Sequence, residues 1–435
     1  MAYKEALTYL DRLGVDAMKS MSPSLHRMEA LCEVLDHPER QVPALHITGT
    51  NGKTSTARIA ASLLQATGLS VGTYTSPHLQ TVRERIALGN DPISEEDFGA
   101  AFDHLFPYLE VVEDKLGERL TFFEVLTGMF FLWAADTAVN AMVLEVGLGG
   151  RWDATNVVDA PVGLITNVAL DHTGLLGTER PTIAKEKSGI VKPASTVVTG
   201  ERLPDVLAVI EAEASGVGAE TAVLGRDFDV TSNETAVGGR FLSVRTSRSG
   251  YEDLFLPLHG AHQGVNATLA LEAVGRFVGG EPLSDEVVAE GFAKTTVPGR
   301  LESMPVRETS VVLDVAHNPD GISAFVSGLL GAFAFERLIV VLGILEDKDH
   351  LGMLTELTRI PCHVITTEAK SVRSRPPDEL AAAAQNLGLS SEVVLEIDAA
   401  IDHALGLAGE GELVSVTGSH YVVGDARTHL KGKPH

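Results

Sequence analysis

The sequence predicts an α/β protein with two doubly wound domains, a larger N-terminal one and a smaller C-terminal one. Short apolar runs rich in β-branched residues alternate with helical patterns, which is typical of a mainly parallel sheet covered by helices. A stretch of alternating polar and apolar residues interrupts this pattern at 223–258, and a Pro-Gly-Arg segment at 298–300 precedes a second, shorter repetition of it. We therefore expect a small β insertion and a linker at these two places.

Four strands are expected in the first half of the chain, and each ends at a glycine-rich or polar loop. They are residues 42–48, 69–75, 141–146 and 162–169, and a helix at 57–67 follows the first of them. Ligands of open parallel sheets bind beyond the carboxyl ends of the strands. Because the polar residues follow directly after these runs, we expect them to share one edge of the sheet.

The insertion and the second domain complete the predicted fold. Within the insertion, 228–230 and 240–244 alternate like exposed antiparallel strands, and a helix at 267–277 follows. After the linker at 297–300 we expect strands at 311–314, 338–342, 362–366 and 412–416 and a helix at 322–335, which is typical of a Rossmann-like α/β domain. The expected domains are therefore residues 1–297 and 298–435.

Composition and charge exclude several classes of function. The 435 residues are 44% hydrophobic and 21% charged, which is ordinary for a globular protein. The net charge of −25 argues against a partner that needs broad phosphate neutralisation, so we expect no nucleic acid and no anionic membrane. The N-terminus lacks the apolar core of a signal peptide, and Cys32 and Cys362 show no metal-ligand spacing. We therefore expect a cytoplasmic protein.

The first strand runs into a glycine-rich loop that is typical of phosphate binding. Its residues are Gly49, Thr50, Asn51, Gly52, Lys53, Thr54 and Ser55. Glycines let backbone N–H groups close around phosphate oxygens, the following helix adds a partial positive charge, and a lysine adds a full one. We interpret this segment as the phosphate loop of a P-loop NTPase-like domain. The alternative, a helix start without a ligand, leaves Lys53 unexplained.

Three polar side chains beyond strand ends suggest a divalent cation. Glu145 ends an apolar run, where a carboxylate is costly unless it is paired or metal-bound. Ser76 and His172 follow two other runs, and one carboxylate, one imidazole and one hydroxyl near a phosphate loop suit Mg²⁺. The alternatives are a structural salt bridge for Glu145 and a structural role for His172.

With these motifs the chain resembles the folylpolyglutamate synthases, in particular the bifunctional bacterial form that is also a dihydrofolate synthase, in the Mur ligase superfamily. The resemblance extends over nearly the whole chain. It rests on GTNGKTST (49–56), TSPHL (75–79), RERI (83–86), LTFFE (120–124), LEVGLGGRWDATN (144–156), LDH (170–172), AKEKSGI (184–190), HGAHQGVNA (259–267), PGRLE (298–302), DVAHNPDG (314–321) and TGSHYVVGD (417–425).

The resemblance implies a role for each matching position. It implies ATP at the phosphate loop and at Asn266, Arg300 and Asp314, a first Mg²⁺ at Ser76, Glu145 and His172, a second Mg²⁺ at a carbamylated Lys187, a glutamate-binding and catalytic role for His317, and a pterin-side pocket at Thr121, Phe123 and Asp153. The implied catalytic residues are Lys53, Lys187 and His317. Plainer interpretations stay open: a surface lysine at 187, a capping pair of Asp314 and His317, a linker arginine at 300, and core phenylalanines at 122 and 123.

Two positions depart from the family pattern. Thr54 stands where many members have glycine, so the sequence leaves open whether Thr54 or Ser55 faces the metal. Val315 stands where glycine is frequent, which affects the loop that carries His317 but removes no functional side chain.

The implied reaction is ATP-dependent amide synthesis. A carboxylate of dihydropteroate or of a reduced folate becomes an acyl phosphate, and the amine of L-glutamate displaces the phosphate. We expect a monomer whose domains close about residues 297–301 before chemistry. Two alternatives stay open: a related ligase acting on a muramyl peptide, although only 48 residues precede Gly49, and a non-catalytic ATP-binding module.

Overall fold

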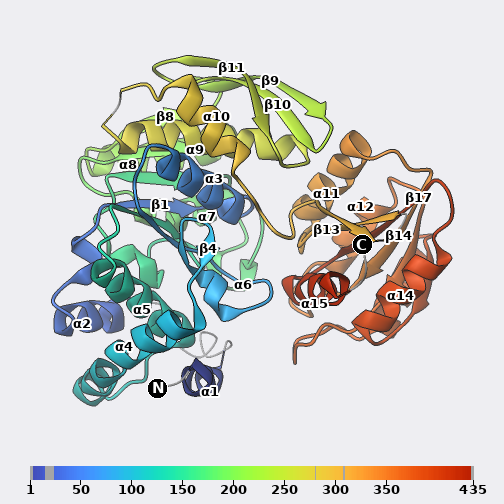
Figure 1. The fold of residues 1–435 in the computed structure, drawn as a ribbon, viewed down its shortest axis with the longest axis horizontal. Helices are drawn as coiled ribbons and strands as arrows, with labels where there is room; N and C mark the ends of the chain where they lie inside the picture. Colours follow the sequence, from blue (N-terminus) through green and yellow to red (C-terminus); the bar gives the residue numbers. More distant parts are fainter. Residues whose placement is uncertain (1–2, 15–23, 280, 307–308, 433–435) are drawn as a thin grey trace.

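The computed structural model describes residues 3–14, 24–279, 281–306 and 309–432. Figure 1 shows two α/β units, a larger N-terminal one and a smaller C-terminal one, with the chain crossing between them after helix α10 (Asp285–Ala293). The predicted fold class is confirmed. None of the helices in these ranges is long and apolar enough to cross a membrane.

The larger unit is built on a sheet of eight strands in the order β4-β3-β2-β5-β1-β6-β7-β8. The strands are β1 (Ala44–Thr48), β2 (Val71–Tyr74), β3 (Ile86–Leu88), β4 (Asp91–Pro92), β5 (Ala141–Glu145), β6 (Val162–Ile165), β7 (Thr196–Thr199) and β8 (Glu220–Val223). All pairs are parallel except β2–β3 and β3–β4 at one edge. The four predicted strands are present, and the sequence analysis missed the four others.

The predicted strand at 162–169 is too long by four residues. β6 ends at Ile165 because the next residues turn to hold the phosphate loop instead of a neighbouring strand. The Thr166 hydroxyl donates to the Asn51 carbonyl at 2.7 Å, and Asn167 Oδ1 accepts from the Asn51 backbone N–H at 3.0 Å. Side chain–backbone hydrogen bonds of this kind offer the chain an alternative to the sheet ladder.

Alternate residues of the central strands enter two separate cores. Met142 and Leu144 of β5 belong to one cluster, whereas Ala141 and Val143 belong to another. The first cluster includes α1 (Tyr3–Leu13), α2 (His26–Val34), α4 (Glu95–Leu116) and α5 (Phe122–Asp136), and the second includes α3 (Lys53–Ala66), α9 (Ala261–Phe277) and α10. A third cluster packs α7 (Arg180–Lys187) and α8 (Pro204–Gly216) beside β6 and β7. The remaining short helices are α6 (Thr173–Leu176), η2 (Pro38–Arg40), η3 (Val82–Arg85), η4 (Ala154–Val157) and η5 (Ser188–Ile190).

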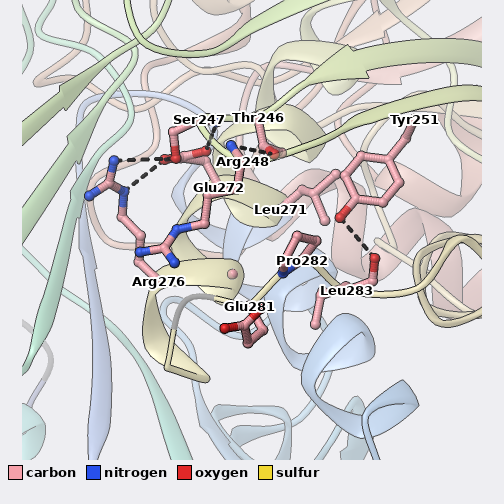
Figure 2. Close-up of a pocket in the computed structure, with 11 residues that line it drawn as sticks. Thr246, Ser247, Arg248, Tyr251, Leu271, Glu272, Arg276, Glu281, Pro282 and Leu283 are labelled. Carbon is pink, nitrogen blue, oxygen red and sulfur yellow. Dashed lines mark hydrogen bonds and ion pairs between the residues drawn. The ribbon is translucent and has the colours of Figure 1, made fainter.

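The β insertion is a three-stranded antiparallel sheet in the order β11-β10-β9. Its strands are β9 (Asp229–Ala236), β10 (Gly239–Arg245) and β11 (Gly250–Leu256). The predicted antiparallel insertion is present, but the sequence predicted two of its three strands. Figure 2 shows how the turn between β10 and β11 is fastened to α9. The Ser247 N–H and hydroxyl donate to Glu272 at 2.9 and 2.7 Å, and Arg276 donates to the same carboxylate at 2.7 Å.

The smaller unit has six strands in the order β12-β13-β17-β14-β15-β16. They are β12 (Glu302–Val306), β13 (Thr309–Leu313), β14 (Arg337–Leu342), β15 (Cys362–Thr366), β16 (Ser390–Val393) and β17 (Glu412–Thr417). Helices α11 (Pro319–Ala332), α12 (His350–Leu357) and α13 (Pro377–Asn386) share one core with the sheet, and α14 (Ile397–Leu407) and α15 (His420–Lys431) share the other. Helices therefore cover both faces, as predicted.

Three predicted helices begin too late. The first runs from Lys53, the second from Ala261 and the third from Pro319. Local backbone features explain the true starts of the first and third. Gly52 takes a left-handed conformation (φ 85°), whereas Asn318 caps its helix by accepting from the Gly321 N–H at 2.7 Å.

Candidate active site

The phosphate loop depends on two glycines that no other residue can replace without a shift of the neighbouring groups. A Cβ at Gly49 would lie 1.8 Å from Thr166 Oγ1, and one at Gly52 would lie 2.5 Å from Asn266 Oδ1. Both glycines have positive φ. Helix α3 begins directly afterwards, so its first-turn N–H groups and the positive end of its dipole face the loop. This is the arrangement that binds phosphate.

Two lysines converge on the loop. Lys53 Nζ donates to the Gly49 and Thr50 carbonyls at 3.0 and 3.2 Å, and Lys187 Nζ donates to the Gly49 carbonyl at 2.8 Å. Lys187 is buried, so the interpretation of it as a surface lysine is wrong. Burial and then the charge of Lys53 lower the pKa of Lys187 to about 7. A substantial fraction of Lys187 therefore carries a neutral amine at neutral pH.

Glu145 ends β5 with its side chain buried beside the loop. One carboxylate oxygen accepts from the Thr54 hydroxyl at 2.8 Å, and the other accepts from the Ser76 backbone N–H at 3.1 Å. Burial raises the pKa of Glu145, and the nearby charge of Lys53 opposes the shift. No lysine or arginine among the described residues forms an ion pair with Glu145. The alternative interpretation of Glu145 as half of a structural salt bridge therefore finds no partner among these residues.

The structure brings some of the predicted metal residues to Glu145 and leaves His172 apart from them. Glu145 contacts the Thr54 hydroxyl and the backbone N–H of Ser76, whereas Ser55 is buried inside α3. The exposed His172 ring lies near Asp171, with Nε2 3.8 Å from the carboxylate, and within the described ranges it has no hydrogen bond to Glu145 or Ser76. The described residues contain no group of three or more His, Cys, Asp or Glu that could hold a metal.

Asn266 faces the loop from α9, and Gln263 fixes its orientation. Asn266 Nδ2 donates to Gln263 Oε1 at 3.0 Å, which leaves Asn266 Oδ1 against Gly52. Sequence reasoning did not select Gln263. Its spacing of three residues before Asn266 on a helix was the signal that could have identified it.

Arg300 and Asp314 lie where the chain enters the second unit. Asp314 accepts from the Leu301 and Ala316 backbone N–H groups, both at 2.9 Å. Burial raises the pKa of Asp314, and Arg300 counteracts it. The interpretation of Asp314 and His317 as a helix-capping pair is wrong, because Asn318 caps α11.

Asp171 joins the two units, and sequence reasoning did not assign it a role. Lys348 Nζ forms an ion pair with it at 2.8 Å, His317 Nε2 lies 3.6 Å from it, and Asn318 Nδ2 donates to it at 3.3 Å. Burial is the largest single effect and raises the pKa of Asp171, but His317, Lys348 and His172 together outweigh it, so the pKa is lowered. All three partners come from the second unit, so they hold His317 close to the phosphate loop.

Two of the predicted pterin-side residues, Phe123 and Asp153, contact the residues that directly follow β5. Phe123 packs against Tyr74, with ring centroids 5.7 Å apart, and occupies the space that a Cβ at Gly147 would need. Phe123 is only partly buried, whereas Phe122 is a core residue. Asp153 is buried and accepts from the Leu148 N–H at 2.9 Å, and burial raises its pKa.

Thr121 has a structural task that the sequence analysis did not predict. Its hydroxyl accepts from the Glu124 N–H at 3.2 Å, Glu124 accepts from the Thr121 N–H at 2.8 Å, and Arg27 holds Glu124 at 3.0 Å. These contacts form a capping box at the start of α5.

Thr121→Ala is therefore expected to lower the free energy of unfolding by about 1 kcal/mol, because the first turn of α5 loses its cap. Urea unfolding measures this change. Thr137→Ala, at the exposed far end of the same helix, serves as the control and should change stability by no more than about 0.5 kcal/mol. Unchanged stability together with a raised KM for the expected pterin substrate would instead place this hydroxyl on the substrate.

Comparisons with known proteins agree along the whole chain. Residues 47–274 match the model of the Mur ligase middle domain, and residues 299–420 match that of the Mur ligase, glutamate ligase domain. A dihydrofolate synthase/folylpolyglutamate synthase of Mycobacterium tuberculosis is 39% identical over 94% of this chain and 90% of its own length, and one of Bacillus subtilis is 35% identical over 99% of both. The folylpolyglutamate synthase structure of M. tuberculosis complexed with ADP superposes with a TM-score of 0.94 at 37% identity, covering 100% of this chain and 99% of that one. A FolC structure of Escherichia coli in complex with DHPP and ADP has a TM-score of 0.88 at 27% identity, covering 99% and 98%.

Proposed function

We propose a mechanism from one premise: the chain belongs to the Mur ligases, in the branch of the dihydrofolate synthases/folylpolyglutamate synthases. It is an ATP-dependent ligase that joins L-glutamate to a carboxylate in folate synthesis and folate polyglutamylation. The observation that carries the mechanism is the meeting of Glu145, Thr54 and Ser76 beside Lys53 on the phosphate loop.

The first step is activation of the substrate carboxylate. A carboxylate oxygen attacks the γ-phosphorus of ATP, ADP leaves, and an acyl phosphate forms; the glutamate amine then attacks the acyl carbon and expels phosphate. The loop N–H groups and Lys53 hold the phosphates of ATP in line. When phosphate oxygens replace the Gly49 and Thr50 carbonyls as acceptors, the Lys53 ammonium neutralises charge that moves onto the leaving ADP.

The residues present fit a hard divalent cation at Glu145. A buried carboxylate beside two hydroxyl-bearing residues offers oxygen donors and leaves room for water and phosphate oxygens, which Mg²⁺ prefers. We place a first Mg²⁺ at Glu145, Ser76 and His172, with Thr54 rather than Ser55 as the loop hydroxyl at the site. When bound, the ion neutralises the phosphate oxygens of ATP. His172 would have to turn from Asp171 to join it.

Lys187 is the candidate for carbamylation. Its buried amine has a lowered pKa and lies at the loop, and a carbamate would turn a cation into an anion that suits a second Mg²⁺. The remaining assignments are proposals of the same kind: ATP contacts at Asn266, Arg300 and Asp314, glutamate binding at His317, and pterin contacts at Thr121, Phe123 and Asp153.

The two units divide the work in this proposal. Residues 1–297 bind ATP and the folate-side substrate, and residues 298–435 bring His317 and L-glutamate to the acyl phosphate. The Asp171 contacts support closure of the units about residues 297–301, because Lys348, His317 and Asn318 all lie beyond the linker. The monomeric state and the cytoplasmic location remain predictions.

The test is a coupled assay of ADP release. We expect release that requires both L-glutamate and either dihydropteroate or tetrahydrofolate, and comparison of the two acceptors shows which of the two reactions the chain favours. Turnover with a muramyl peptide alone would contradict the proposal, and no turnover with any acceptor would favour the non-catalytic alternative.

A further inference from the structure

Arg85 belongs to the RERI motif, to which the mechanism above assigns no role. It ends η3 and is only 5% exposed. Its Nε donates to His78 Nδ1 at 3.0 Å, its guanidinium hydrogen-bonds with the Tyr74 hydroxyl, and its Cζ lies 5.2 Å from the centroid of the Phe122 ring. A guanidinium has more N–H donors than these two acceptors use.

Among the residues that the structure describes, Arg85 has no counter-ion of the kind that a buried arginine normally has. Arg27 is equally buried, and it forms ion pairs with Glu124 at 3.0 Å and Glu118 at 3.1 Å. No carboxylate in the described part of the chain forms an ion pair with Arg85. The adjacent Glu84 is occupied, because it accepts the backbone N–H groups of residues 79–81 at 2.8–2.9 Å.

The side chains in contact with Arg85 in the described part of the chain supply no direct anionic partner. Burial, followed by the charge of Arg85, lowers the pKa of His78 to about 4, so this imidazole is a neutral acceptor. A buried cation without an anion is costly, and an interaction with an aromatic face offsets only part of that cost. An anionic ligand that enters the site would supply the missing partner.

The position of Arg85 indicates which ligand this is. Tyr74, which hydrogen-bonds with Arg85, also packs against Phe123 of the proposed pterin-side pocket. On the other side, the charge of Glu145 acts on Arg85. Ser76, which lies in the same segment after β2 as Arg85, contacts Glu145. A pteroate or folate that runs from Phe123 to the phosphate loop carries its carboxylates through this region.

We propose that Arg85 binds a carboxylate of the folate-side substrate and makes the enzyme select an anionic group at that point. The inference rests on the proposed function and adds a substrate-binding residue to it. Two carboxylates share this chemistry: the reacting one, which dihydropteroate also has, and the non-reacting α-carboxylate of a glutamyl tail.

The test compares binding of a carboxylate and of its carboxamide. Isothermal titration of the full chain without L-glutamate is made with dihydropteroate, tetrahydrofolate and the corresponding carboxamides. The wild type should prefer the carboxylate by roughly 10- to 100-fold, and Arg85→Gln should lose that preference because no cation then faces the group. If Arg85→Gln loses the carboxylate preference with both dihydropteroate and tetrahydrofolate, Arg85 binds the reacting carboxylate. If it loses the preference with tetrahydrofolate alone, Arg85 binds the α-carboxylate.

Arg83→Gln is the matched control. Arg83 lies on the same turn but donates to the Ile93 carbonyl at 2.9 Å, so the preference should remain. Arg85→Lys keeps the charge and should retain part of the preference, and thermal unfolding of each variant confirms that it is folded. A full carboxylate preference in Arg85→Gln overturns the inference alone. A wild type that binds neither dihydropteroate nor tetrahydrofolate overturns the proposed function and this inference together.

Discussion

Replacing Glu145 by glutamine is expected to lower kcat for glutamate ligation by about 100-fold or more. The glutamine keeps the shape of the side chain and an oxygen that can accept from Thr54 or Ser76, but it removes the negative charge beside the phosphate loop. Binding of Mg²⁺–ATP should weaken, whereas metal-free nucleotide should bind nearly unchanged. Steady-state kinetics over a range of Mg²⁺ concentrations measures the effect.

Stability distinguishes a metal ligand from a structural carboxylate at this position. Glu145 is buried and has no ion pair in the described part of the chain, so its neutralisation should not lower the urea midpoint. Glu201→Gln is the matched control, because Glu201 is also buried but accepts backbone N–H groups from Val168 and Leu203 at 2.9 Å. That variant should lose stability and keep its kcat. A Glu145→Gln enzyme that unfolds at lower urea and still turns over would show a structural carboxylate.

Lys187→Met is expected to reduce kcat by about 100-fold because the enzyme loses the amine that we propose is carbamylated. In carbamylation the neutral amine attacks CO₂, a C–N bond forms, and the nitrogen releases a proton. Because the pKa of Lys187 is lowered to about 7, the neutral amine predominates above that pH and the ammonium below it. Activity in CO₂-depleted buffer should therefore be low at every pH, and added bicarbonate should restore it more fully above pH 7, where the neutral amine predominates, than below it.

Lys185→Met is the control for Lys187, since Lys185 lies on the same helix with its side chain exposed. Native mass spectrometry of the wild type and of Lys185→Met should show an added mass of one CO₂ that Lys187→Met lacks. Full activity of Lys187→Met, or bicarbonate dependence that persists in it, would contradict a carbamate at this position.

The elements that the sequence predicted share one property: their signal is local. The phosphate loop, the central parallel strands and the β insertion each follow from glycine placement or from the period of apolar residues within about ten positions. The missed strands β3, β4, β7, β8, β12 and β16 are short and mostly lie toward the edges of the two sheets, where burial patterns weaken. β6 shows the opposite error. The apolar pattern predicted a strand to residue 169, but hydrogen bonds of residues 166 and 167 with the phosphate loop end the strand at Ile165.

The candidate site divides in the same way. Glu145, Ser76 and His172 could be selected from the sequence because each follows a strand, but only the fold shows that Thr54 rather than Ser55 faces Glu145 and that His172 lies by Asp171. Asp171 was missed because its partners lie on other elements, and Gln263 was missed although its i, i+3 spacing to Asn266 was visible in the sequence.

The sequence by itself determined the fold class, the phosphate loop and the family resemblance, because spacing, glycine placement and apolar periodicity are properties of neighbouring residues. Only the tertiary structure decided which charges are balanced. Arg27 and Arg85 look alike in the sequence, yet one is paired with two carboxylates and the other forms no ion pair in the described part of the chain. Ion pairing and burial depend on residues that are distant in the chain, and their free energies depend on which partner the fold brings within a few ångströms.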